Sequence, residues 1–241
     1  WGASKVGGVI GHIAYNVTID QCANYGNVKT TRYNGTCGGI VGEAFCYNNA
    51  STTAGTTGLG TFKILNCFNR GNLFNVNGYS AGIVGNINQA NGTIENCYNA
   101  ASVWGAKNAA ILGTAARTNG GSLTIHRCFF AETIPGAAKA VYTPASGAYV
   151  LTYVSTFQLK LEYNEFSYDS KVANAACNTT QFLKSSRKTA AGMTRATYLN
   201  YLNTDTTDNG VDTANKFMKP PVSDVLYLAN DGFPIHSTIL S

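Results

Sequence analysis

One repeated position in the first half of the chain carries residues suited to acid–base chemistry. Two residues before each of four cysteines stand Asp20, Leu65, Glu95 and His126. If Glu95 and His126 lie on adjacent strands, their side chains form half of an acid–base pair. Leu65 interrupts the column, however, and glycosidases need two positioned carboxylates. We therefore expect a solvated face with one ordinary cross-strand pair and no catalytic residue.

Other chemical motifs in the chain are weaker. Residues 78–82 read Gly-Tyr-Ser-Ala-Gly, which matches the nucleophile elbow of hydrolases. That elbow requires a strand-to-helix turn, whereas these residues lie within a glycine-rich repeat. The three histidines, His12, His126 and His236, lack metal-binding spacing, and no phosphate-binding loop occurs. We expect no cofactor, no metal and no enzymatic activity.

These residues belong to a repeat of about thirty residues. Each unit opens with a glycine-rich strip and continues with a strip that ends in cysteine. The opening strips are residues 7–11, 38–42, 81–85 and 109–113, and the cysteine strips are residues 18–22, 63–67, 93–97 and 124–128. Short β-branched strips separated by Gly and Asn predict strands joined by tight turns.

The repeat predicts an all-β fold, a parallel β-helix or β-solenoid of about four irregular coils over residues 1–135. Equivalent residues of neighbouring coils would then stack about 4.8 Å apart. The units are too short for propeller blades. Two interior columns follow, one of Ile10, Val41, Val84 and Leu112, and one of Ile19, Ile64, Ile94 and Ile125.

Residues 136–241 lack the repeat and are predicted to form a C-terminal α+β cap of strands plus a short helix near residues 194–203. A solenoid ends in an open strand edge and an exposed core, which must be covered to avoid aggregation. The alternative is a lectin-like carbohydrate-binding module in this half.

The repeat motif resembles a known family. Gly-Gly-Ile-Val-Gly at residues 38–42, followed by Ile-x-Asn-Cys-Tyr/Phe-Asn at residues 94–99, resembles the GLUG repeat of large secreted and cell-surface proteins, mostly bacterial. The resemblance covers about residues 5–135, and the fourth unit departs from it at Ala109, Ala110 and Phe130. It implies a β-helical stalk or adhesin-like segment without a defined activity.

The seven cysteines follow the repeat. Four occupy one repeat position and are predicted to form a structural ladder, namely Cys22, Cys67, Cys97 and Cys128. Side chains that point the same way have poor disulfide geometry, so we expect these thiols to be mostly reduced. Cys37 and Cys46 flank the second glycine-rich strip as a weaker candidate pair, and Cys177 is left over.

The composition is poor in charge. Only 12% of residues are charged, against about 25% in a typical soluble domain. This excludes a coiled coil and a charge-driven disordered chain. The net charge of +5 from 17 basic and 12 acidic residues is too sparse for a nucleic-acid binder. No apolar run is long enough for a transmembrane helix.

Two further sets of residues bear on partners. The Asn-x-Ser/Thr sites are as frequent as chance predicts and are candidate glycosylation sites only in a eukaryotic source. They are Asn16, Asn34, Asn49, Asn91 and Asn178. The candidate exposed aromatic contacts are Tyr25, Tyr79 and Trp104, which fall in predicted turns.

Together these features predict a non-catalytic extracellular or cell-surface repeat segment that acts as adhesin, stalk or assembly scaffold of a larger protein. Its expected partners are proteins or glycans at a cell surface, or further copies joined through solenoid edges. A β-helix polysaccharide lyase or hydrolase is the alternative. We read the chain as a fragment or processed form, since it opens at Trp1 inside the repeat pattern.

Overall fold

A computed structural model describes residues 4–46, 60–88, 90–116, 121–126, 128–130, 157–162, 196–203, 216–219 and 233–237. Most of these residues lie in β-strands, and α3 (Ala196–Asn203) is a helix of eight residues. The all-β fold class is thereby confirmed.

The strands of the described residues form four separate parallel sheets and one short antiparallel pair. Sheet A contains β1 (Lys5–Gly7), β6 (Thr36–Gly38), β10 (Leu73–Ala81), β14 (Val103–Ala109) and β5 (Val28–Thr30). Sheet B contains β2 (Ile10–Ile13), β7 (Val41–Ala44), β11 (Val84–Asn88) and β15 (Leu112–Ala116). Sheet C contains β3 (Val17–Asp20), β8 (Thr61–Leu65), β12 (Asn91–Glu95), β16 (Gly121–His126) and β18 (Phe157–Glu162). Sheet D contains β4 (Ala23–Asn24), β9 (Phe68–Asn69), β13 (Tyr98–Asn99) and β17 (Phe129–Phe130), and the antiparallel pair is β19 (Phe217–Met218) with β20 (Ile235–His236).

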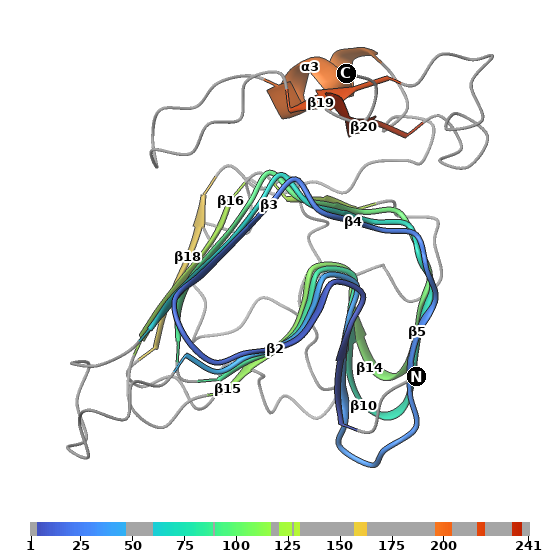
Figure 1. The fold of residues 1–241 in the computed structure, drawn as a ribbon, viewed down its shortest axis with the longest axis vertical. Coiled ribbons are helices and arrows are strands. Elements are labelled where there is room, and N and C mark those ends of the chain that lie inside the picture. Colours follow the sequence, from blue (N-terminus) through green and yellow to red (C-terminus); the bar gives the residue numbers. More distant parts are fainter. Residues whose placement is uncertain are drawn as a thin grey trace.

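The chain visits sheets A, B, C and D in turn and then begins again one strand further on. Strands from successive circuits therefore stack behind one another along the view of Figure 1. The long strand β10 closes one circuit and opens the next, since residues 73–75 pair with β5 and residues 79–81 pair with β6.

Both predicted interior columns are confirmed by the strand register. Ile10, Val41, Val84 and Leu112 are successive partners in sheet B, and Ile19, Ile64, Ile94 and Ile125 are successive partners in sheet C. All eight belong to, or pack against, one hydrophobic core. The repeat therefore sets the register, because a slip of one residue would turn each apolar column toward solvent.

The corner between sheets C and D requires a left-handed backbone at the residue before the cysteine, which accounts for the asparagines found there. Asn66 and Asn96 have positive φ angles of 52° and 53°, and Gln21 in the first circuit has 51°. Asn reaches this left-handed region more cheaply than most residues do. The amides also form a ladder, because Nδ2 of Asn96 donates to Oδ1 of Asn66 at 2.7 Å, and Nδ2 of Asn66 donates to Oδ1 of Asp20 at 2.7 Å.

A second asparagine ladder runs through the interior of the stack. Nδ2 of Asn24 donates to Oδ1 of Asn69 at 2.7 Å, and Nδ2 of Asn69 donates to Oδ1 of Asn99 at 2.8 Å. Each amide also bonds the backbone two residues further on, at Gly26, Gly71 and Ala101. The three side chains are buried with their hydrogen bonds satisfied, as buried amides must be.

This ladder requires glycine on the facing wall. A Cβ placed on Gly39 would lie 2.0 Å from the carbonyl oxygen of Gly82 and 2.4 Å from Cγ of Asn69. A Cβ on Gly82 would lie 2.2 Å from Cγ of Asn99. In the fourth circuit Ala110 replaces the glycine where Phe130 replaces the asparagine, so the two positions change together.

The described residues of 136–241 occupy two places. Strand β18 pairs with β16 and extends sheet C beyond residue 135. Helix α3 and strands β19 and β20, which we call the C-terminal segment, lie against the side of the stack over sheet D (Figure 1). Phe68 and Tyr98, from successive circuits, stack at 4.9 Å and share a buried cluster with Leu202, Phe217 and Ile235.

The predicted helix near residues 194–203 is present as α3. The predicted boundary between residues 135 and 136 stays a prediction.

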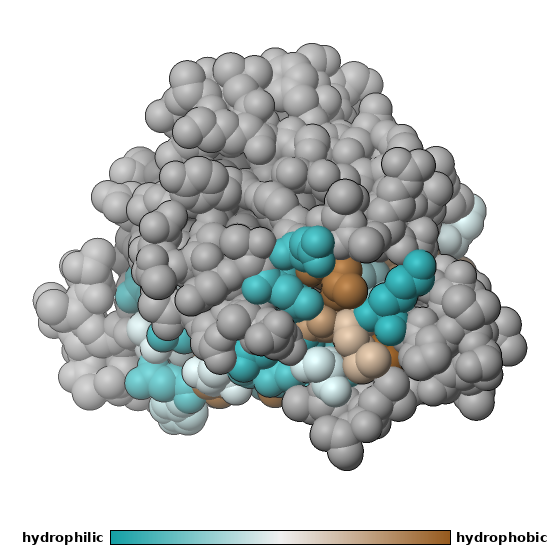
Figure 2. All heavy atoms as spheres, turned by 90° about the horizontal axis from the view of Figure 1, so that it is seen from above, coloured by the Kyte–Doolittle hydropathy of each residue, from teal (hydrophilic) through white to brown (hydrophobic). Residues whose placement is uncertain are grey.

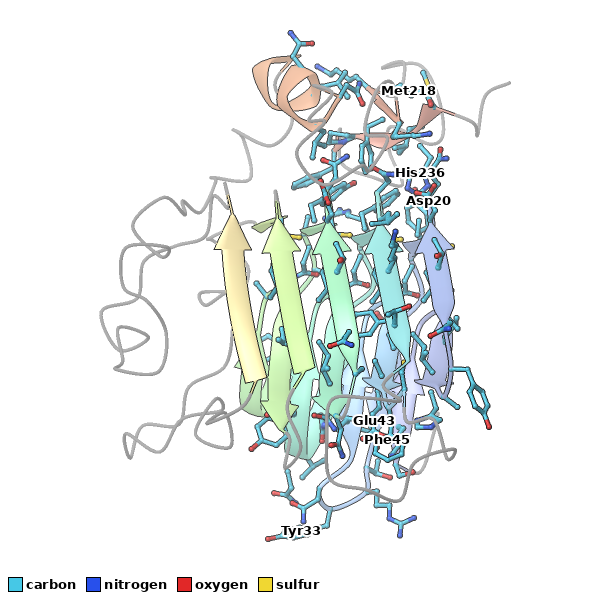
Figure 3. All side chains as sticks on the ribbon, turned by 90° about the vertical axis from the view of Figure 1, so that its left-hand side faces the viewer. Asp20, Tyr33, Glu43, Phe45, Met218 and His236 are labelled. Atoms are coloured by element: carbon cyan, nitrogen blue, oxygen red, sulfur yellow. The ribbon has the colours of Figure 1, made fainter. Side chains whose placement is uncertain are left out.

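Polar contacts orient the C-terminal segment on sheet D. The Tyr98 hydroxyl donates to the carbonyl oxygen of Pro234, and Nδ2 of Asn96 donates to that of Leu202 at 2.9 Å. Nε2 of His236 lies 2.7 Å from the carbonyl oxygen of Asn66, and Figure 3 shows His236 close to Asp20. Because a carbonyl oxygen only accepts, the neutral His236 ring carries its proton on Nε2.

We predict that Gly39→Ala destabilises the fold. The added methyl group overlaps a backbone oxygen and Asn69, so the free energy of unfolding should fall by about 1–3 kcal/mol or more. Urea denaturation provides the measurement. Gly26→Ala is the matched control, because its Cβ would meet only Oδ1 of Asn24, at 3.7 Å. Equal stability of the two variants would show that the glycine column is not a packing requirement.

We also predict that acid loosens the C-terminal segment. Burial lowers the pKa of His236, against smaller raising effects of the Asn66 carbonyl and Asp20. Neutral His236 therefore stabilises the fold fully above its unfolded pKa of about 6.5, and this contribution is lost as the pH falls through the lower folded pKa. The thermal midpoint of the wild type should drop more between pH 7.5 and 5 than that of His236→Gln, and parallel drops would contradict the assignment.

Candidate functional site

A row of side chains crosses β5 and the first residues of β10 and β14, at the right-hand wall of the stack in Figure 1; Lys29 of this row is half-buried, whereas Phe74 and Trp104 are exposed. Lys29, Phe74 and Trp104 are register partners on these three neighbouring strands. Phe74 is 37% exposed and Trp104 is 48% exposed. The preceding residue of each strand (Val28, Leu73, Val103) is buried in a small core on the opposite side, so strand alternation turns the row outward.

A polar row lies two residues earlier on the same side of the wall. Oδ1 of Asn27 accepts from the backbone N–H of Asn72, and Oδ1 of Asn72 accepts from that of Ser102, both at 3.1 Å. We call the surface formed by both rows the β5 face, comprising Lys29, Phe74, Trp104, Asn27, Asn72 and Ser102. Rigid aromatic groups beside fixed amides are typical of sites that recognise polar ligands with apolar surfaces.

The three aromatic residues expected at the surface differ in exposure. Tyr25 and Trp104 are exposed, and Tyr25 meets Phe68 edge to face at 5.6 Å. Tyr79 is half-buried. Phe74 was missed because its turn position in the sequence gave no sign that β10 continues through residues 73–81 in register with Trp104.

The four cysteines of the repeat lie together inside the corner of the stack. The Cys22 N–H donates to Sγ of Cys67, and the Cys67 N–H donates to Sγ of Cys97, both at 3.4 Å. The thiols donate to carbonyl oxygens, such as Cys97 to Glu95 at 3.2 Å and Cys128 to Ile94 at 3.5 Å. None of the four forms a disulfide, nor does Cys37 or Cys46, whereas Cys177 lies outside the described residues.

These thiols are not poised for reaction. Burial raises the pKa of Cys67 and Cys97 well above the usual range, and burial raises the pKa of Cys37 to about 11. The hydrogen bond with Cys67, followed by burial, raises the pKa of Cys22. Nucleophilic and metal-binding cysteines need the thiolate form, so the ladder serves packing.

The predicted acid–base column exists in the backbone register. Asp20, Leu65, Glu95 and His126 are successive partners in sheet C, and Glu162 of β18 continues the column beside His126. Glu95 itself is fully buried. A general acid or base must reach the proton it transfers, so Glu95 is not accessible to a polymeric substrate in this state.

A cluster missed by the sequence analysis surrounds Glu43. This buried carboxylate pairs with the Lys5 ammonium through Oε2, which also lies 3.2 Å from Nδ1 of His12, and its Oε1 accepts from Asn86 at 2.8 Å. His12, Glu43, Asn86 and Thr114 follow the last glycine of each strip and are register partners. Their shared position in the repeat could have indicated this cluster from the sequence. Pairing offsets the desolvation cost of the carboxylate.

The elbow-like motif and the candidate glycosylation sites differ in exposure. Ser80 of the elbow-like motif is fully buried within β10, so it lacks the exposed turn that an elbow requires. Asn16 and Asn34 are exposed and Asn91 is half-buried. Asn49 and Asn178 lie outside the described residues.

No group of three or more His, Cys, Asp or Glu side chains suited to a metal ion occurs among the residues that the structure describes. Within the same residues, no helix has both the length and the hydrophobicity to cross a membrane.

We predict that the described cysteines are protected thiols. Iodoacetamide at pH 8 should leave Cys67 and Cys97 unmodified in the folded protein, because burial holds their pKa values high. After unfolding without reductant, the intact mass should show at least six additions, one for each described cysteine. Fewer additions would reveal a disulfide and contradict the ladder.

Comparison with known proteins adds no relative: no family model, no curated protein and no solved structure matches the chain. The resemblance to GLUG repeats therefore stays a prediction from the residues.

Proposed function

We propose that this chain is a β-solenoid segment of a larger extracellular or cell-surface protein, in which it acts as a non-catalytic scaffold that presents a binding face. The solenoid is supported by the order in which the chain visits the four parallel sheets, each circuit adding strands in the same sequence. It is also supported by hydrogen bonds between equivalent asparagines of successive circuits, which join Asn24 to Asn69, Asn69 to Asn99, and Asn66 to Asn96.

One observation carries the non-catalytic role: Glu43 and Glu95 of the stack are buried, whereas Phe74 and Trp104 are exposed. Glu95 is fully buried, and Glu43 is buried against Lys5 and His12. Asp20 is exposed, but its partner in the column is Leu65. Phe74 and Trp104, in contrast, face solvent from a rigid wall. Such a surface is suited to binding, and none of the Asp or Glu residues that the structure describes lies on its strands.

A polysaccharide lyase or hydrolase is the second candidate. The observation that favours it is the register of Glu95, His126 and Glu162, which places three titratable residues on adjacent strands of sheet C. A lectin-like activity of residues 136–241 and self-assembly through strand edges stay predictions. Viewed from above (Figure 2), the described residues form a patch that is hydrophobic at its centre and hydrophilic around it.

The proposal predicts accessibility at the surface of the source cells without polysaccharide turnover. Antibodies against the folded chain should label intact cells as strongly as permeabilised cells. The purified chain should release neither reducing ends nor unsaturated products from pectic, alginate or neutral polysaccharides. Labelling that needs permeabilisation would overturn the location. Turnover that Glu95→Gln abolishes, while Glu43→Gln retains it, would establish the enzyme instead.

A further inference from the structure

We propose that the β5 face binds a polysaccharide whose sugars carry carboxylate groups. This inference rests on the proposed role as a surface scaffold and names the partner of its binding face. The occupant is a chain of pyranose rings that lies across the strands, with ring faces on Phe74 and Trp104 and carboxylates toward Lys29.

The aromatic row supplies the first part of the argument. Neighbouring strands lie about 4.8 Å apart, so Lys29, Phe74 and Trp104 follow one another at that spacing across three circuits. Both rings are exposed to water, and the backbone of each is fixed in paired strands. Stacking of a ligand on them therefore costs little ordering entropy. Pyranose rings have an apolar C–H face that suits such a platform, and their hydroxyl groups remain free at the edges.

The polar row supplies the second part. Oδ1 of Asn27 and Oδ1 of Asn72 are each held by a backbone N–H, which fixes the orientation of both amides. No described residue accepts a hydrogen bond from the Nδ2 group of either amide. Each Nδ2 is thus a fixed donor beside the aromatic row, suited to the hydroxyl or carboxylate oxygens of a sugar.

The charge distribution decides between neutral and acidic sugars. The stretches 21–39, 66–82 and 96–114, which include β5, β10 and β14, contain no Asp or Glu. Of the basic residues in these stretches, Lys29 is in register with the aromatic row, whereas Arg70 donates to the carbonyl oxygen of Ala100 and lies over the Phe233 ring. The acids of the described circuits lie on sheets B and C instead, at Asp20, Glu43, Glu95 and Glu162. A wall with one sign of charge attracts ligands of the opposite sign.

Single-stranded nucleic acid also combines negative charge with stacking groups. It requires basic side chains along its whole backbone, however, with strong salt dependence from many contacts. The aromatic row has one lysine in register with its two rings, and the chain as a whole has a net charge of only +5. The sparse charge and the amide donors favour an acidic polysaccharide.

The test is calorimetric titration of the full chain with polygalacturonate and with its methyl-esterified form, which has the same rings without the charge. Polygalacturonate should bind, and the ester should bind at least about tenfold more weakly. Phe74→Ala and Trp104→Ala should each weaken binding by about tenfold, whereas Trp104→Phe should keep most of it. Lys29→Gln should weaken binding to polygalacturonate and leave binding to the ester unchanged.

Matched controls come from exposed residues outside the β5 face. Tyr15→Ala removes an exposed aromatic side chain between β2 and β3, and Lys63→Gln removes an exposed charge on β8. Both variants should bind like the wild type, and urea denaturation should show all variants equally folded. Absence of binding, binding by Phe74→Ala and Trp104→Ala as tight as that of the wild type, or tighter binding of oligo-dT would each overturn the proposal. The scaffold role is tested separately by surface labelling of the source cells. A negative titration would therefore contradict the polysaccharide ligand without contradicting the scaffold role.

Discussion

The structure depends on a fit between buried asparagine amides and the glycines that face them across the interior of the stack. Asn69 reaches across to Gly39 and bonds the equivalent amides of the circuits before and after it. A side chain on the glycine would displace the amide, and loss of the amide would leave buried polar groups unsatisfied. The strand register follows from this fit, because only one alignment of neighbouring circuits closes the ladder.

The same stacking governs which residues the surface can carry. Parallel circuits place equivalent positions side by side, so a charge repeated in every unit would repel its own copies. Uncharged Asn, Ser, Thr and Gly satisfy hydrogen bonds at these positions without that cost, which accounts for a charged fraction of only 12%. Where a carboxylate does occur in the stack, as at Glu43, neighbouring circuits supply Lys5, His12 and Asn86 around it. The β5 face departs from this uniformity, and that departure is what makes it a candidate binding surface.

Much of the core could be predicted because it repeats. The spacing between Ile94 and Cys97 is the same in every unit of the repeat. In a parallel stack, equal spacing predicts which residues of neighbouring strands pair. Features without a repeated residue type escaped prediction. His12 and Glu43 share a repeat position but not a chemistry, and Phe74 aligns with Trp104 only because β10 and β14 pair residue by residue. Tyr79 was expected at the surface and is half-buried, since strand β10 includes the position that the sequence suggested was a turn.

The all-β class, the two apolar columns and the alignment of the four cysteines could be predicted from the residues alone, because local periodicity and strand alternation suffice for these. The role of the acid–base column depends on the folded chain. The register of Glu95 with His126 was readable from the spacing, whereas the burial of Glu95 depends on the complete packed chain. Likewise, the C-terminal segment lies over Phe68 and Tyr98 on the side of the stack, because burial of those stacked rings requires a partner from distant sequence. Contacts between the repeat and the non-repeating C-terminal segment have no periodic signature in the sequence, so they are found only in the folded structure.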